Sequence, residues 1–372
     1  MLKLYELISS EVLLAESKLR LSVPSDIKKL YKLFKNNGKQ LFVVGGAVRD
    51  AILGKSPKDF DLATDAKPDD VLDIAKQGGF KTVEVGKSFG VVIVNGHEIA
   101  TFRKDIGKGR RPDSVDYTDI EGDVKRRDLT INALFYDIGR AEIVDLVGGI
   151  KDLKKKRIRT VGNPEQRFDE DPLRKLRAVR FAGSVGGRMD KETWQALANN
   201  PDISGVSAER IRDEFIKGIK KAKSVQNYLK MVLKLGMFNQ IYPGLRINKS
   251  FTKTNDYIVQ IANILRKQHS SSVYMGLSKL KYTKQEVRDV NHLLQLSEFQ
   301  PENIYQIKVQ EKLTKLDNRQ IKEWAAIVGG DVMKVWKFKL TVTAKDAVSQ
   351  GYKGKEIGDF IKDTETTRYL GK

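Results

Sequence analysis

Two acidic residues separated by a single position are the first feature of the sequence that could do chemistry. In Asp59-Phe60-Asp61, a strand would place both carboxylates on one face and Phe60 on the other. Carboxylates that share a face repel each other unless a cation lies between them, and open sites with oxygen ligands suit Mg²⁺. Such ions can activate an attacking hydroxyl and stabilise a leaving pyrophosphate. Taken alone, an Asp-x-Asp pattern is more often a solvated strand edge or a turn.

A glycine pair lies thirteen residues before Asp59. Residues 43–50, with the sequence VVGGAVRD, predict a buried strand that runs through Gly45 and Gly46 into a helix with Arg49 in its first turn. Glycines let the backbone approach a ligand closely, and a helix N-terminus presents free N–H groups, so the segment could bind a triphosphate. The other interpretation is a tight turn followed by a surface arginine.

A third carboxylate and a basic run follow these motifs. Glu98 is predicted to face away from Ile99 on a strand beside the aspartate pair, where it could complete a metal site or accept a hydroxyl proton. As a solitary strand residue it would simply face solvent. Residues 125–128, with the sequence KRRD, contain Arg127, and clustered cations of this kind suit contact with phosphate or ribose. The alternative is a solvated helix end.

A regular series of charged residues occurs further along the chain. Asp171, Arg174, Arg177 and Arg180 recur at every third position, which predicts neighbouring positions along one helix face. Cytosine and adenine each show an amino donor and a ring-nitrogen acceptor on the pairing edge, whereas uracil and guanine show a carbonyl and an N–H. An acceptor beside a donor could therefore accept CTP and ATP and exclude UTP and GTP. The alternative is a stripe of surface salt bridges.

The hydrophobic pattern predicts strands first and helices afterwards, which is typical of an α+β protein. Runs typical of strands occupy residues 41–44, 80–85, 91–94, 99–102 and 157–161, and the last of these is the final predicted strand. Helices are predicted within residues 1–21, from a cap at Ser25 to Asn36-Asn37-Gly38, and over residues 68–76, 171–182, 190–198, 207–219 and 225–235. Residues 104–125 have too few apolar side chains for a strand or a core helix, so a long loop is expected there.

Composition restricts the class of protein further. The 372 residues, 40% of them hydrophobic, are enough for two or three domains. The 68 Lys and Arg residues against 48 Asp and Glu give a net charge of +20, which favours a polyanionic partner, although a chain can be basic for solubility alone. With no cysteine and no apolar run of 18 residues, we expect a soluble, cytoplasmic protein without disulfides. His97, His269 and His292 lack ligand spacing, which disfavours a histidine-based metal hydrolase.

The order and spacing of these motifs resemble the class II tRNA nucleotidyltransferase family, which contains CCA-adding enzymes and bacterial poly(A) polymerases. The resemblance covers residues 41–180 densely. It rests on residues 45–50 (GGAVRD) with 59–61 (DFD), on residues 126–133 (RRDLTINA), and on residues 170–174 (EDPLR) with 177–181 (RAVRF).

The resemblance implies a polymerase-beta-like head with a mixed β-sheet, followed by an all-α neck, body and tail. We accordingly expect an N-terminal helical extension in residues 1–24 and the nucleotidyltransferase head in residues 25–163. The neck, with the helices that read the base, is expected in residues 164–236, and a tRNA-binding body and tail in residues 237–372.

The resemblance also implies a role for each candidate residue. Asp59 and Asp61 would bind Mg²⁺, and Glu98 would take the third carboxylate position of the catalytic centre. Asp171 and Arg174 would pair with the base of the incoming nucleotide. Further nucleotide contacts would come from Gly46, Arg49, Arg127, Arg177 and Arg180.

The implied activity is template-independent addition of C, C and A to the tRNA 3′ end from CTP and ATP, with release of pyrophosphate. Residues 103–123, which include Arg110-Arg111-Pro112, match a flexible loop that CCA-adding enzymes have and CC-adding relatives lack, and residues 86–91 resemble the CCA-adding form more than the poly(A) polymerase form. A poly(A) polymerase, a CC-adding enzyme and a non-catalytic RNA-binding protein remain the alternatives. Neither a membrane nor a protein partner is indicated. Basic residues that could follow the phosphates of a tRNA acceptor stem are Lys151, Lys154, Lys155, Lys156, Arg157 and Arg159, with Lys217, Lys220, Lys221 and Lys223.

Overall fold

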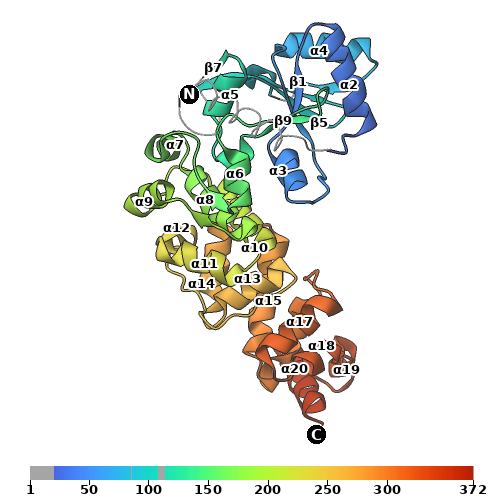
Figure 1. Cartoon of the computed structure of the whole chain (residues 1–372). Coiled ribbons are helices and arrows are strands. Elements are labelled where there is room, and N and C mark those ends of the chain that lie inside the picture. Colours follow the sequence, from blue (N-terminus) through green and yellow to red (C-terminus); the bar gives the residue numbers. More distant parts are fainter. Residues whose placement is uncertain (1–20, 85, 108–113, 372) are drawn as a thin grey trace. The chain divides into compact units, whose positions relative to one another are not determined.

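The computed structural model describes residues 21–84, 86–107 and 114–371 (Figure 1). The helix predicted before residue 21 and the Arg110-Arg111-Pro112 segment lie outside the described residues. The chain forms two compact units, with the boundary between Val206 and Ser207. Among the described helices, none is long and apolar enough to cross a membrane.

A seven-stranded mixed sheet organises the first unit. Its strand order is β3-β4-β5-β2-β1-β8-β9, and β2 and β5 form the parallel pair in an otherwise antiparallel arrangement. Strand β1, which lies between β2 and β8, has four apolar residues and is buried along its whole length. The strands are β1 (Leu41–Val44), β2 (Asp61–Thr64), β3 (Thr82–Val83), β4 (Val91–Val94), β5 (His97–Thr101), β8 (Phe135–Asp137) and β9 (Glu142–Val144).

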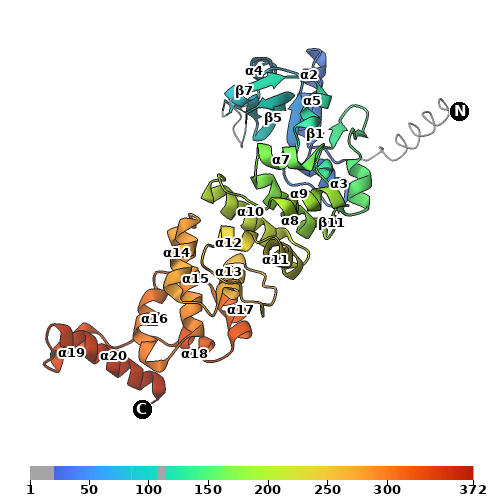
Figure 2. The same cartoon turned by 90° about the vertical axis from the view of Figure 1, so that its left-hand side faces the viewer.

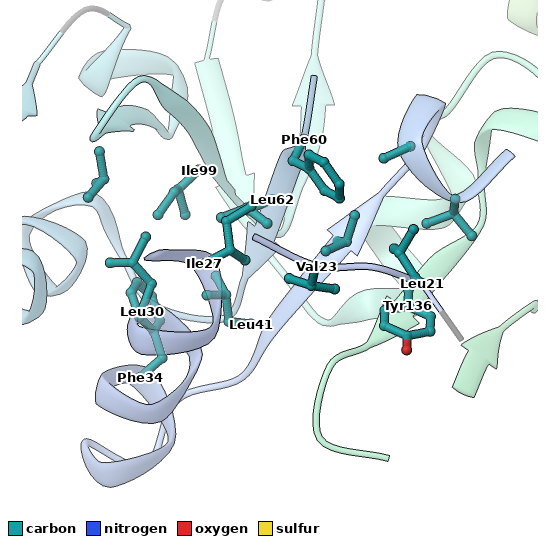
Figure 3. Packing of buried hydrophobic residues seen from close by; sticks show 14 of the residues in the cluster. Leu21, Val23, Ile27, Leu30, Phe34, Leu41, Phe60, Leu62, Ile99 and Tyr136 are labelled. Carbon is teal, nitrogen blue, oxygen red and sulfur yellow. The ribbon is translucent and has the colours of Figure 1, made fainter. Parts of the chain in front are cut away.

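Two helices cover one face of this sheet. The apolar stripe of α2 (Ser25–Asn36), formed by Ile27, Leu30 and Phe34, is buried in the same cluster as Leu41 of β1 and Leu62 of β2 (Figure 3). Residues of α4 (Pro68–Gln77) join the same cluster. The prediction that Asn36-Asn37-Gly38 ends the first of these helices is confirmed. The predicted cap at Ser25 is wrong, because the helix already begins at Ser25 and Pro24 holds the N-cap position.

The opposite face of the sheet carries a smaller core. Phe42, Phe102 and Phe135 form a triangle with ring centroids 6.1 Å apart, and two of the three pairs meet edge to face. Val44 of β1 and Ala63 of β2 belong to the same cluster. This face also carries the hydrophilic side chains that lie one residue away from the core-facing positions of β2 and β5.

A loop was expected over residues 104–125, but the described parts of this range form regular structure. They contain a hairpin of β6 (Arg103–Ile106) and β7 (Ser114–Tyr117), followed by α5 (Ile120–Lys125) with its N-terminus capped by the Asp119 side chain. The prediction was wrong because the two strands pair with each other and need few apolar residues. Helix α5 in turn buries one large apolar side chain, Val124, together with Gly122 and Asp123.

The first unit also contains a separate sheet of two short strands. Strand β10 (Arg157–Ile158) pairs in parallel with β11 (Arg188–Met189), so the strand predicted to be the last has a partner further along the chain. The strand predicted over residues 80–85 is also reduced, to β3. The helices around β10 and β11 are α6 (Gly149–Lys154), α7 (Pro164–Glu170), α8 (Leu173–Val185) and α9 (Lys191–Asn199).

The second unit is helical throughout its described residues. Helix α15 packs against α13 and α14 (Figure 2). A turn at Tyr242-Pro243-Gly244 separates α12 from α13. The helices are α10 (Ala208–Lys221), α11 (Val225–Lys234), α12 (Met237–Ile241), α13 (Tyr257–Leu265), α14 (Ser270–Lys279), α15 (Lys284–Ser297), α16 (Ile304–Glu311), α17 (Asn318–Val328), α18 (Val332–Lys337), α19 (Ala344–Ser349) and α20 (Lys355–Leu370). The predicted α+β class, with a mixed sheet before an all-helical remainder, is confirmed.

Candidate active site

The predicted strand, glycine pair and helix are all present between β1 and α3 (Gly46–Ile52). Gly45 connects them with φ +65° and ψ −114°, a conformation that residues with a Cβ rarely adopt. Its N–H donates to the carbonyl of Leu134 at 3.0 Å, and its own carbonyl accepts from the Arg49 N–H at 3.0 Å. A Cβ at this position would lie 3.6 Å from Arg127 Nη1, so the turn brings the backbone close to that guanidinium.

The carboxylates are positioned by strand register. Leu62 of β2 pairs with Ile99 of β5, and both are buried in the core under α2 and α4. Since side chains alternate along a strand, Asp61 and Glu98, one residue earlier on each strand, lie on the opposite face. Asp59 precedes β2, and it is exposed while Phe60 is buried. The predicted alternation of the Asp59-Phe60-Asp61 segment is therefore confirmed.

The surroundings of Asp61 disfavour the charged form of its carboxylate. Desolvation by the surrounding protein raises the pKa of Asp61, and the negative charges of Glu98 and Asp59 raise it further, while Arg127 opposes the shift. A cation would relieve this repulsion, and the available donors are carboxylate oxygens of the kind that Mg²⁺ prefers. The aspartate pair therefore fits a divalent ion. Among the described residues, no group of three or more acidic or histidine side chains is arranged to hold one.

Arg127 is fixed beside the glycine turn by a buried acid. Its Nε and Nη2 donate to Asp123 Oδ2 at 3.1 and 2.9 Å, and its Nη1 donates to the carbonyl of Asn132 at 3.2 Å. The guanidinium also lies over the Phe135 ring, 4.5 Å from its centroid. Burial raises the pKa of Asp123, but the charges of Arg127 and Arg126 outweigh it, so the pKa lies below its usual value.

Arg49 is held in the same manner. Its Nη1 donates to Asn132 Oδ1 at 2.6 Å, and its Nε and Nη2 donate to Asp50 Oδ1 at 3.0 and 2.8 Å. Arg49 and Arg127 each use three of the five N–H donors of a guanidinium in these bonds, which leaves two on each for a ligand. The side chain and carbonyl of Asn132 thus join the two arginines.

Helix α8 contributes Arg177 and Arg174. Arg177 Nε donates to Asp128 Oδ2 at 2.7 Å, and Asp128 Oδ1 accepts from Asn132 Nδ2 at 3.2 Å. Arg174 Nη2 donates to the carbonyl of Arg126 at 2.9 Å, and its Nη1 contacts the Glu170 carboxylate. Both arginines therefore bind the segment that carries Arg127.

The predicted single face of Asp171, Arg174, Arg177 and Arg180 is wrong in two respects. Asp171 precedes the helix, because Pro172 is its N-cap residue and the Asp171 backbone is extended, and Asp171 Oδ1 accepts from the Leu173 N–H at 3.2 Å. Arg180 is 6% exposed and lies over the Phe181 ring, 3.8 Å from its centroid. A three-residue spacing falls short of the 3.6-residue turn, so the series winds around the helix.

For three residues of this network, the sequence motifs predicted no role in the site. Phe181 has the guanidinium carbons of Arg49 and Arg177 at 5.1 and 5.6 Å from its ring centroid, so it joins α3 to α8. Asp123 is fully buried, and its spacing of three and four residues from Arg126 and Arg127 was the signal that could have revealed it. Asn132 lay within a recognised motif, but its links to both arginines depend on tertiary structure.

Comparison with known proteins finds two matching families and several similar enzymes. Residues 41–159 match the family described as the poly A polymerase head domain, and residues 188–247 match the family described as the probable RNA and SrmB-binding site of polymerase A. The chain is 39% identical over 234 residues to the CCA-adding enzyme of Bacillus pumilus, which covers 60% of this chain and 57% of that protein. It is 40% identical over 215 residues to the CCA-adding enzyme of Bacillus subtilis, covering 56% of this chain and 52% of that protein. The chain thus spans about half the length of the curated relatives it matches.

Solved structures match over a longer range. The Bacillus stearothermophilus CCA-adding enzyme in complex with CTP aligns with a TM-score of 0.71 and 25% identity, covering 94% of each chain. The Thermotoga maritima CCA-adding enzyme complexed with tRNA aligns with a TM-score of 0.65 and 20% identity, covering 94% of this chain and 93% of that one, and shows the shared fold.

The region that matches the head-domain family, residues 41–159, contains the strands of the seven-stranded mixed sheet, and this family is a polymerase-beta-like nucleotidyltransferase family that generally uses a divalent metal. The chain is thus similar to the poly A polymerase head family over residues 41–159 and to CCA-adding enzymes over more than half of its length.

Proposed function

We propose that this protein adds C, C and A to the 3′ end of tRNA, using CTP and ATP and releasing pyrophosphate. The observation that carries the proposal is the hydrogen-bond network in which Asn132 and Asp128 join Arg127, Arg49 and Arg177. The charge of Arg127 also acts on the Asp61 carboxylate. The relatives named as CCA-adding enzymes support this choice over the alternatives. Action on cellular tRNA would place the reaction in the cytoplasm.

Asp59 and Asp61 are the proposed ligands of Mg²⁺, and Glu98 is the proposed third carboxylate of the catalytic centre. When bound there, the ion would offset the negative charge that builds up between the attacking 3′ oxygen and the α-phosphate. The chain itself provides the orientation. Arg127, which lies beside the Gly45 turn, is anchored to Asp123 before any ligand arrives, so little side-chain entropy is lost when it binds phosphate.

The triphosphate is proposed to lie along Gly46, Arg49 and Arg127, with Arg177 and Arg180 as further nucleotide contacts. The unused guanidinium donors of Arg49 and Arg127 suit phosphate oxygens, which accept charge-assisted hydrogen bonds. Exposure of Asp59 and Asp61 leaves them accessible to a metal-bound nucleotide.

Asp171 and Arg174 are proposed to select the base. Asp171 is 9% exposed, so a uracil or guanine edge would set its carbonyl oxygen against a buried carboxylate, acceptor against acceptor. Arg174 already contacts Glu170 and the Arg126 carbonyl, so a base would bind a side chain whose direction is set. The head, neck and body divisions at residues 163 and 236 remain predictions of the same proposal.

Incubation of the protein with tRNA lacking its 3′ CCA and each labelled nucleotide separately, then with CTP and ATP together, tests the proposal. We expect CTP incorporation first and one ATP afterwards. Incorporation of ATP alone into long tails would indicate a poly(A) polymerase, and CTP alone a CC-adding enzyme. RNA binding without any incorporation, unchanged in Asp59→Ala and Asp61→Ala variants, would indicate a non-catalytic RNA-binding protein.

A further inference from the structure

A pocket lined by basic side chains opens beside the two-stranded sheet of β10 and β11 (β11 is labelled in Figure 2). It has a volume of about 370 Å³, and its lining includes Lys155, Lys156, Arg157 and Arg188. Two glycines and a methionine complete the lining, so no described carboxylate faces the space. None of these residues belongs to the nucleotide network described above.

The backbone around this pocket is built to bring the cations together. Lys156 has φ +51°, which residues with a Cβ rarely adopt. Its carbonyl accepts from the Arg188 N–H at 3.0 Å, and a Cβ on Gly187 would lie 1.8 Å from the same carbonyl oxygen. A side chain at position 187 would therefore separate the two segments. The register then places Arg157 directly opposite Arg188.

This arrangement leaves positive charge without an internal counterion. Lys155, Lys156 and Arg188 are exposed, and their side chains make no hydrogen bond or ion pair with any described residue. Arg157 does contact an acid, the fully buried Asp152, but Arg159 shares that carboxylate through a 2.8 Å bond. Like charges opposite each other on neighbouring strands are destabilising, so a bound anion would stabilise this corner of the fold.

We propose that this pocket binds the phosphodiester backbone of RNA, as a contact separate from the nucleotide site. A water molecule occupies about 30 Å³ of liquid, so the pocket has room for a phosphate group and part of its ribose. Exposed, flexible cations suit a backbone that is bound by charge rather than by base identity. Arg188 is also the first residue of the region, residues 188–247, that matches the family described as the probable RNA and SrmB-binding site of polymerase A. The inference rests on the proposed function in one respect, that the RNA is tRNA.

The test compares the salt dependence of RNA binding in two double variants of the full chain. The pocket variant is Lys155→Gln with Arg188→Gln. The control is Lys28→Gln with Lys29→Gln, which removes the same charge from exposed positions on α2 in the same unit. Binding of fluorescently labelled tRNA lacking CCA is measured by anisotropy, without nucleotide, over a series of salt concentrations. Equal melting temperatures establish that the variants are folded.

We expect the slope of log affinity against log salt to become shallower by about 1 to 2 in the pocket variant and to stay at the wild-type value in the control, because each phosphate contact contributes about −0.9 on a duplex. Lys155→Glu with Arg188→Glu should weaken binding further at every salt concentration. Equal slopes for pocket variant, control and wild type would overturn the proposal, as would a wild-type protein that binds no RNA. The proposed function fails separately, if the wild type binds tRNA but incorporates no nucleotide.

Discussion

Arg177 Nε of α8 donates to Asp128 Oδ2 at 2.7 Å, and this ion pair joins the helix that follows the head to the segment that carries Arg127. The Asp128 side chain is 10% exposed and the Arg177 side chain 32%. Burial raises the pKa of Asp128, but the Arg177 charge and its hydrogen bond outweigh this effect, so the pKa lies below its usual value. Through Asp128 and Asn132, the contact joins Arg177 to Arg49 and Arg127 in one hydrogen-bond network.

Replacing Asp128 with Asn should weaken the link between α8 and the segment that carries Arg127. Removing one partner leaves Arg177 without its counter-charge, so we expect the free energy of unfolding to fall by about 1 to 3 kcal/mol, less than for a fully buried pair. CTP affinity should fall by about tenfold because Arg177 loses its fixed direction. Denaturant unfolding and calorimetric titration measure both effects. Asp213→Asn, which breaks the exposed pair with Arg212, should change neither appreciably, and unchanged CTP affinity in Asp128→Asn would contradict the prediction.

Asp61→Asn should abolish catalysis without destabilising the protein. The substitution removes a carboxylate that is repelled by Glu98 and Asp59, so we expect the melting temperature to stay the same or rise. Nucleotide incorporation should fall by about 10² to 10³-fold or more, because stabilisation of the developing charge is lost. Asp73→Asn removes the same charge from an exposed position on α4 and should leave both quantities unchanged. A clear drop in melting temperature would show that Asp61 has a structural role.

Gly45→Ala should cost both stability and nucleotide binding. An alanine at φ +65° is strained by about 1 to 3 kcal/mol, and any relaxation of the turn displaces the backbone beside Arg127. Gly54→Ala is the matched control, since Gly54 has φ +70° and a Cβ added there would meet no described atom within 4 Å. We expect similar losses of stability but weaker CTP binding in Gly45→Ala alone. Equal CTP affinities in the two variants would show that the Gly45 turn does not contribute to nucleotide binding.

His292 should make the stability of the helical unit depend on pH. Burial, followed by the charge of Lys308, lowers the pKa of His292 from 6.5 to about 4, and neither ring nitrogen has a protein partner among the described residues. Because the unfolded chain takes up a proton near pH 6.5 and the folded chain does not, stability is lost as the pH falls from about 6.5 to about 4.

The measurement compares His292→Leu with the wild type. Between those pH values the wild type should lose about 3 kcal/mol more unfolding free energy than the variant. His269→Gln, at an exposed position, should follow the wild-type curve. Parallel curves for wild type and His292→Leu would show that the ring is protonated in the folded protein.

Features set by short-range geometry could be predicted from the sequence. The four apolar residues of β1 and the glycine pair after them determine a strand and a turn within ten residues. The alternation of Phe60 with Asp59 and Asp61 follows from the two-residue period of an extended chain. Glu98 was assigned to the correct face for the same reason, because Ile99 is apolar and buried.

Features that depend on long-range partners could not be predicted. Asp171 has the spacing of a helix residue, but Pro172 determines where α8 begins. The spacing of Asp123 from Arg126 and Arg127 indicates ion pairs but not full burial, since the burial depends on tertiary contacts such as that of Arg127 with Phe135. The hairpin of β6 and β7 satisfies its backbone by pairing with itself, so it leaves no apolar pattern to read.

The pairing of Leu62 with Ile99 has a consequence for how this protein can change over time. A single inserted or deleted residue within β2 or β5 would turn Asp61 or Glu98 inward and expose an apolar side chain in its place. Loss of the core and loss of the reaction would therefore occur together, in one mutational step. Variation in chain length should accumulate in the connections between these strands, while the strands keep a constant number of residues.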